Sequence, residues 1–155
     1  MFRIADNLRG QVNTLCDGRM SGCYRLFVTH EKDELRNSIN RLLGTDCEGI
    51  LYIGASSHLP NRMSQLKTAI SARYGVGRYT NYWAHVAGAK FTQPVRSLFP
   101  FEHLRVEIFP CNPNTPGQPA AHFVEEATLM RAYILQYGEA PPLNGWRWKR
   151  EMEAA

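Results

Sequence analysis

The sequence has few cysteines, no long apolar run and no internal repeat, and each absence removes a class of protein. Its four cysteines form no CxxC pair, which argues against a zinc knuckle, and they are too sparse for a disulfide scaffold. No apolar stretch approaches the length that crosses a bilayer, and the first residues lack the apolar centre of a secretory signal. We therefore expect a cytoplasmic protein with reduced thiols and no membrane partner.

Length and composition indicate one folded domain with a mild basic excess. The 155 residues are 44% apolar and 11% aromatic, which suits a globule with a buried core and not a disordered chain. The net charge of +4 fits a polyanionic partner. Most proteins with this balance bind no nucleic acid, so charge alone assigns no function.

Short runs of β-branched and aromatic residues alternate with longer segments of helical periodicity. We expect strands over residues 22–29, 49–54 and 104–109, helices over residues 31–43, 59–74 and 120–137, and a loop with a short helix over residues 77–89. This order predicts an α/β fold in which helices flank a small three-stranded sheet. The first two strands can pair with each other despite the helix expected between them.

The two ends of the chain differ from the segment between them. Residues 1–20 are polar and weakly patterned, so we expect a loosely packed lead-in with at most a short helix. A single domain is expected over residues 21–144. In the tail, residues 145–155, aromatic and basic residues alternate, namely Trp146, Arg147, Trp148, Lys149 and Arg150. This pattern suits stacking on bases and neutralising phosphates, and it equally suits a packed tail with a solvated basic end.

Five sequence features occur in a fixed order and on the expected elements. They are Gly22-Cys23-Tyr24 on the first strand, Tyr52-Ile53-Gly54 on the second, Arg62 ten residues past Tyr52, Glu126 three residues before Leu129 on the last helix, and Asn144 after a proline-containing turn. This arrangement resembles the GIY-YIG nuclease family over residues 21–144.

The resemblance implies a GIY-YIG-like α/β sandwich that acts as a metal-dependent endonuclease and hydrolyses phosphodiester bonds in nucleic acid. The implied partner is double-stranded DNA, and the implied cofactor is Mg²⁺ or Mn²⁺. One alternative is a nucleic-acid-binding module that keeps this fold and cuts weakly, and a protein-interaction domain is a third interpretation. The sequence contains no recognition code, so specificity must come from the loops, the inserted segment, a homodimer or a partner.

Three positions depart from the family pattern. Cys23 stands in place of isoleucine, which is a tolerable apolar exchange. Leu66 stands where many members carry histidine or tyrosine, and Ala55 stands where some carry lysine. Without these polar helpers, proton transfer must fall to Tyr24 or to a histidine from elsewhere, for which His85 is the first candidate.

Glu126 and Arg62 are the candidates for binding metal and phosphate. Glu126 shares a helical stripe with the apolar residues Phe123, Met130, Tyr133 and Tyr137. A buried carboxylate without a partner is costly, and one carboxylate suffices for magnesium, which keeps most of its waters. Arg62 can hold a phosphate through two donors at once. The alternatives are a salt bridge between Glu126 and Arg62, and a surface position for Arg62.

Tyr24 and Tyr52 should project their hydroxyls from adjacent strands into one cleft. A phenol with its ordinary pKa of about 10 is a poor base at neutral pH unless a cation lowers that pKa. We expect Tyr24 to position or deprotonate the attacking water, and Tyr52 to hold the phosphate or the water by a hydrogen bond. The alternative for both tyrosines is a purely structural role, as aromatic strand residues that fill the core.

The expected substrate-binding residues lie near the strand end and in the tail. They are Gly54, Ser56, Asn144, Trp146, Arg147 and Lys149. Gly54 is expected to allow close backbone packing at the end of its strand. Asn144 is also suited to pinning the terminal turn. His85, in an aromatic loop, is a catalytic candidate whose alternative is a purely structural histidine.

Overall fold

A four-stranded antiparallel sheet forms the centre of the molecule, with strand order β1-β6-β2-β5. The computed structural model describes residues 1–16, 21–30, 35–111 and 119–144. The strands of the sheet are β1 (Phe2–Arg3), β2 (Gly22–Val28), β5 (Ile50–Ser56) and β6 (Leu104–Pro110). A separate hairpin pairs β3 (Ile39–Arg41) with β4 (Gly44–Asp46).

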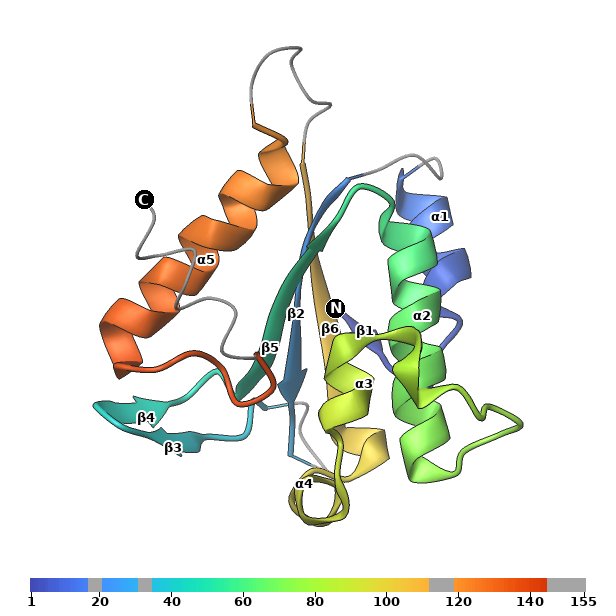
Figure 1. Ribbon diagram of the computed structural model, residues 1–155, viewed down its shortest axis with the longest axis horizontal. Helices are drawn as coiled ribbons and strands as arrows, with labels where there is room; N and C mark the ends of the chain where they lie inside the picture. Colours follow the sequence, from blue (N-terminus) through green and yellow to red (C-terminus); the bar gives the residue numbers. More distant parts are fainter. Residues whose placement is uncertain (17–20, 31–34, 112–118, 145–155) are drawn as a thin grey trace.

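Helices cover both faces of the sheet and give the molecule three layers (Figure 1). On one face, α5 (Ala121–Tyr137) packs against β2 and β5. On the other face lie α1 (Leu8–Cys16), α2 (Leu59–Tyr74) and α3 (Val86–Lys90). The remaining helical segments are the 3₁₀ turn η1 (Tyr82–Ala84), α4 (Gln93–Leu98) and the 3₁₀ turn η2 (Phe101–His103). None of the described helices combines the length and the apolarity that crossing a membrane requires.

Each face of the sheet has its own apolar cluster. The larger cluster joins the sheet to α1 and α2, and it includes both Tyr24 and Tyr52. The smaller cluster lies under α5 and consists of the buried residues Ile50, Ile53, Met130, Tyr133 and Tyr137. Removal of these side chains from water is the main force that holds the three layers together.

The mixed α/β class is confirmed, and so is the pairing of the first two expected strands. β2 and β5 pair antiparallel, with Tyr24 opposite Gly54. α2 has the expected bounds and ends at Gly75, whose φ of 65° is the left-handed conformation that glycine adopts readily. At its start, the His58 ring accepts a hydrogen bond from the N–H of Asn61 at 3.3 Å.

The helix expected over residues 31–43 is wrong in the part that the structure describes, from residue 35 onward. The chain forms the β3–β4 hairpin there. Leu35, Leu42 and Leu43 have helical spacing, but all three are exposed, and the segment is ordered instead by the pairing of β3 with β4. The hairpin is attached to the end of α5, where the N–H of Leu43 donates to the carbonyl of Tyr137 at 3.1 Å.

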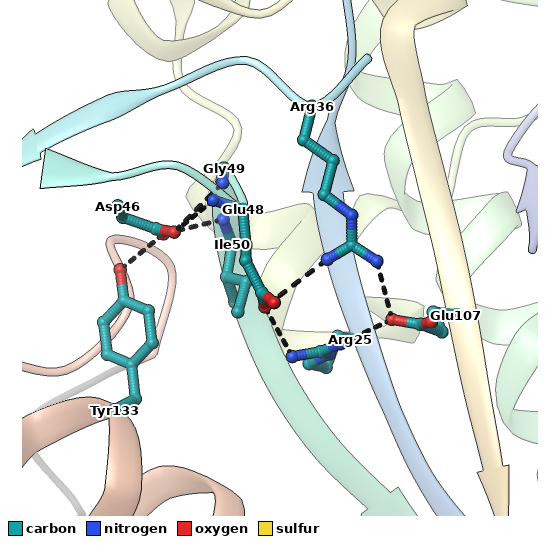
Figure 2. A network of polar contacts seen from close by, with 8 residues as sticks. All are labelled: Arg25, Arg36, Asp46, Glu48, Gly49, Ile50, Glu107 and Tyr133. Carbon is teal, nitrogen blue, oxygen red and sulfur yellow. Dashed lines mark hydrogen bonds and ion pairs between the residues drawn. The ribbon is translucent and has the colours of Figure 1, made fainter. Parts of the chain in front are cut away.

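Asp46 fixes the end of the hairpin through a buried carboxylate. Figure 2 shows it accepting hydrogen bonds from the N–H groups of Glu48, Gly49 and Ile50 at 2.8, 3.1 and 2.8 Å. The hydroxyl of Tyr133 on α5 donates to the same carboxylate at 2.9 Å. Four donors offset the cost of removing this charge from water, and they bind the hairpin to α5.

The sheet has four strands and not the expected three, because the N-terminal segment joins it. β1 pairs with β6, and Phe2 lies opposite Val106. Ile4, Leu8 and Val12 are at most 1% exposed, so the loose packing expected for residues 1–20 is wrong for these positions. Their spacing of four residues suits a single face, but the polar residues between them weaken the pattern.

Candidate functional site

Tyr24 and Tyr52 lie on neighbouring strands with their rings side by side. Their ring centroids are 6.0 Å apart. Gly54, opposite Tyr24 on β5, makes this arrangement possible: a Cβ at that position would stand 2.6 Å from the Tyr24 hydroxyl and 2.6 Å from Cε1 of Tyr52. Any side chain larger than hydrogen at Gly54 would displace one of the two tyrosines.

The loop before α3 carries His85 to the same place. Its Nε2 lies 2.6 Å from the hydroxyl of Tyr24, and its ring centroid is 5.4 Å from that of Tyr52. Its Nδ1 accepts a hydrogen bond from the N–H of Ala87 at 3.0 Å, so His85 also caps α3. One histidine thus joins the start of a helix to the tyrosine pair.

The bond to Ala87 decides how His85 and Tyr24 share their protons. Because Nδ1 is an acceptor, a neutral imidazole carries its proton on Nε2 and donates it to the Tyr24 oxygen. Arg62 donates to the same oxygen from Nε at 3.2 Å. His85 and Arg62 both act as donors to this oxygen, so neither can accept the phenolic proton of Tyr24. Tyr24 can therefore donate that proton only to a third group.

Burial dominates the electrostatics of this cluster. Burial, together with the positive charge of Arg62, lowers the pKa of His85 to about 3, so the ring is neutral at neutral pH. Burial and the neighbouring Tyr52 raise the pKa of Tyr24 well above its ordinary value, and Arg62 acts in the opposite direction. Burial likewise raises the pKa of Tyr52. Both phenols are therefore protonated at neutral pH.

Arg62 is the part of the cluster that is only half-buried. It is the fourth residue of α2, and one of its terminal nitrogens, Nη1, donates to the side chain of Gln65 at 3.3 Å. A guanidinium has five N–H donors, so the contacts to Tyr24 and Gln65 leave donors available for an anion.

Glu126 lies on α5, the helix that covers the opposite face of the sheet (Figure 1). Its residue is half-buried, between the buried His122 and Met130 on the helical stripe. Phe123, expected on that stripe, is 60% exposed and points elsewhere. The negative charge of Glu126 is one of the causes that raise the pKa values of Tyr24 and Tyr52, which places this carboxylate within electrostatic range of both phenols.

The described residues offer carboxylate donors, but not a cluster of them, for the metal expected from the sequence. Within the described ranges, no group of three His, Cys, Asp or Glu side chains is placed to hold a metal ion. Mg²⁺ and Mn²⁺ accept hard oxygen ligands, and Mg²⁺ binds through one or two carboxylates with water and substrate phosphates completing the shell. The single carboxylate of Glu126 fits that kind of site.

The side chains of Ser56 and Asn144 form hydrogen bonds with backbone groups. The hydroxyl of Ser56 accepts a hydrogen bond from the N–H of His58 at 3.0 Å, just before α2. The Asn144 amide accepts from the N–H of Ile53 at 2.9 Å and donates to its carbonyl at 2.7 Å, so it pins the terminal turn to the edge strand β5. The remaining tail candidates, Trp146, Arg147 and Lys149, lie outside the described residues.

The structure thus brings Tyr24, Tyr52, Arg62 and His85 together in direct contact, with Glu126 nearby on another element. No family model, curated protein or solved structure matches the chain. The resemblance to GIY-YIG nucleases therefore stays an expectation from the residues of this sequence. Sequence reasoning missed that His85 and Tyr24 form one unit, because no spacing rule predicts where the loop before α3 returns.

Proposed function

We propose that this protein is a metal-dependent endonuclease with a GIY-YIG-like α/β sandwich, and that it hydrolyses phosphodiester bonds in DNA. The observation that carries the proposal is the environment of the Tyr24 oxygen, which receives hydrogen bonds from both His85 and Arg62. Two fixed donors stabilise a phenolate more than a phenol, so they prepare Tyr24 to release its proton or to orient a water.

Each residue then has one task. Arg62 uses its remaining donors to hold a non-bridging oxygen of the phosphate. Tyr24 orients the attacking water, and His85, which stays neutral, holds the phenol oxygen in place. Tyr52 contributes its hydroxyl to the phosphate or the water. A divalent ion held by Glu126 would supply positive charge for the phosphate in the transition state.

A cleavage assay tests this proposal. Supercoiled plasmid, single-stranded DNA and RNA are incubated with the protein in Mg²⁺, in Mn²⁺ and in excess chelator. We expect cleavage of DNA that requires the metal and falls by orders of magnitude in Glu126→Gln. Glu125→Gln is the matched control, because Glu125 is the neighbouring carboxylate and is exposed. Absence of cutting on every substrate, or full cutting by Glu126→Gln, would refute the proposal.

A second candidate function is a nucleic-acid-binding module that cuts weakly. The favouring observation is that Tyr24 is 0% and His85 1% exposed, so substrate reaches them only if their surroundings move. Leu66, at the place of the family's polar helper, is also fully buried in the core. This function gives binding with little cleavage, and it leaves the residual rate insensitive to Tyr24→Phe.

A further inference from the structure

Positive charge is concentrated in one segment of the chain. Residues 49–101 contain six Lys and Arg and no Asp or Glu, whereas the rest of the chain contains twelve Lys and Arg against fourteen Asp and Glu. The six are Arg62, Lys67, Arg73, Arg78, Lys90 and Arg96. They belong to α2, α3, α4 and the loop between α2 and η1, on the side of the sheet opposite α5 (Figure 1). This segment therefore favours a polyanionic partner, although the chain as a whole is only mildly basic.

An exposed tryptophan stands in the middle of this segment. Trp83, on η1, is 71% exposed, and Tyr79 in the preceding loop is 42% exposed. Tryptophan has a large apolar ring that is normally covered, so an indole left in solvent within a cationic segment calls for a partner with a flat face. Trp83 also lies only two residues before His85, which contacts Tyr24.

Specific contacts hold the turn that carries the Trp83 indole. The side chain of Asn81 accepts a hydrogen bond from the N–H of Trp83 at 3.1 Å. The ring centroids of Tyr82 and Trp83 are 5.1 Å apart. The guanidinium of Arg73 lies over the ring of Tyr82, 3.7 Å from its centroid. Arg73 in turn donates to the carbonyls of Gly88 and Ala89 at 3.3 and 2.9 Å, which joins the end of α2 to α3. The indole is thus presented on a braced turn, which reduces the ordering cost of binding.

We propose that Trp83, assisted by Tyr79, is a stacking platform for an unpaired base, and that the acid-free segment, residues 49–101, attracts the phosphates of the same strand. A base within a duplex has both faces covered by its neighbours, so an indole can stack only on a base outside a duplex. This proposal rests on the proposed function. The sequence led us to expect duplex DNA as the substrate, and the platform narrows that substrate to DNA with a single-stranded stretch beside Tyr24, Tyr52, Arg62 and His85.

Binding of a fluorescein-labelled single-stranded DNA, followed by fluorescence anisotropy in chelator, tests the platform without cleavage. Loss of one base–aromatic stack weakens binding by about fivefold or more, so Trp83→Ala should show at least that loss. Trp83→Tyr keeps a stacking ring and should recover most of the affinity. Leu135→Ala is the matched control, because Leu135 is also 71% exposed but lies on α5.

Three results would overturn the platform: unchanged binding by Trp83→Ala, tighter binding of the matching duplex than of the single strand, or a Trp83-dependent dimer without DNA in sedimentation velocity. The last result would assign this surface to a second copy of the chain. The nuclease proposal fails separately, if Trp83-dependent binding is present but no DNA is cut when Mg²⁺ is added.

Discussion

Tyr24 is the residue on which the polar contacts of the site converge, and its hydroxyl has a structural role besides the chemical one that we propose. Tyr24→Phe leaves a buried donor on His85 and a half-buried donor on Arg62 without their acceptor. An unsatisfied buried donor costs about 1–3 kcal/mol, so the free energy of unfolding should fall by that order. DNA cleavage should fall by orders of magnitude while DNA binding persists.

The control for this experiment is Tyr133→Phe. It also removes a buried tyrosine hydroxyl that donates a hydrogen bond, here to Asp46 under α5. Urea unfolding should show a comparable loss of stability, but the cleavage rate should stay near that of the wild type. Equal loss of activity in both variants would mean that stability, and not the position of the Tyr24 hydroxyl, limits the reaction.

His85 should make the protein less stable in mild acid. Its pKa is about 3 in the folded protein, against an ordinary value of 6.5, so between these values the unfolded chain binds a proton that the folded protein does not. The resulting stabilisation is complete above about pH 6.5 and is lost as the pH falls towards 3, by up to about 1.4 kcal/mol per pH unit. Urea unfolding from pH 7 to pH 4 should be less pH-dependent in His85→Gln. Identical slopes would show that the ring can be protonated without opening the site.

Among the helices and strands, the sequence predicted correctly those segments in which the apolar periodicity and the residues that begin and end the element agree. α2 combines an apolar stripe, a proline in the first turn and a terminal Gly75, and its bounds were predicted correctly. The β3–β4 hairpin was missed because its leucines imitate a helical stripe, while the contacts that form it come from Asp46 and the end of α5. β1 is only two residues long, which is too short for any periodicity to be visible.

An ionic cluster, made of Arg25, Arg36, Glu48 and Glu107, connects β2 and β6 to the segments flanking the hairpin (Figure 2). The Glu107 carboxylate accepts from Arg25 at 2.6 Å and from Arg36 at 3.1 Å. These two arginines lower the pKa of Glu107, although burial alone would raise it. The carboxylate therefore stabilises the fold above its ordinary pKa and loses that contribution as the pH falls through the lowered value.

Glu107→Gln should lower the free energy of unfolding by about 1–3 kcal/mol at neutral pH, because two charge-assisted hydrogen bonds are lost. The difference from the wild type should shrink as the pH falls through the lowered pKa of Glu107, because the carboxylate is then protonated in the folded and the unfolded protein. Thermal unfolding at pH 7 and pH 3 measures both effects. Glu102→Gln, at an exposed position, is the control. A loss that is the same at both pH values would assign the effect to packing and not to charge.

At the scale of the whole molecule, three layers bring distant parts of the chain to one site. The family resemblance singled out Tyr24, Tyr52 and Arg62, and the structure places these three residues together. The sequence did not reveal that the α2–α3 connection brings His85 onto Tyr24, since that contact depends on a loop and on Gly88 packing against Ala69. The acid-free segment, residues 49–101, is visible in the sequence itself, but that its helices lie on the side of the sheet opposite α5 is known only from the fold.

In the proposed reaction, Tyr24 handles the attacking water and His85 supports the Tyr24 phenolate through a donated hydrogen bond. The most direct test is the single-turnover rate of DNA cleavage against pH in the wild type and in His85→Phe, which keeps a ring but has no donor. Because burial raises the pKa of Tyr24, we expect the wild-type rate to rise through the neutral and alkaline range. In His85→Phe the rise should move to higher pH, since one stabilising donor is gone. A cleavage rate that does not depend on pH, or the same dependence on pH in both proteins, would contradict these roles of Tyr24 and His85.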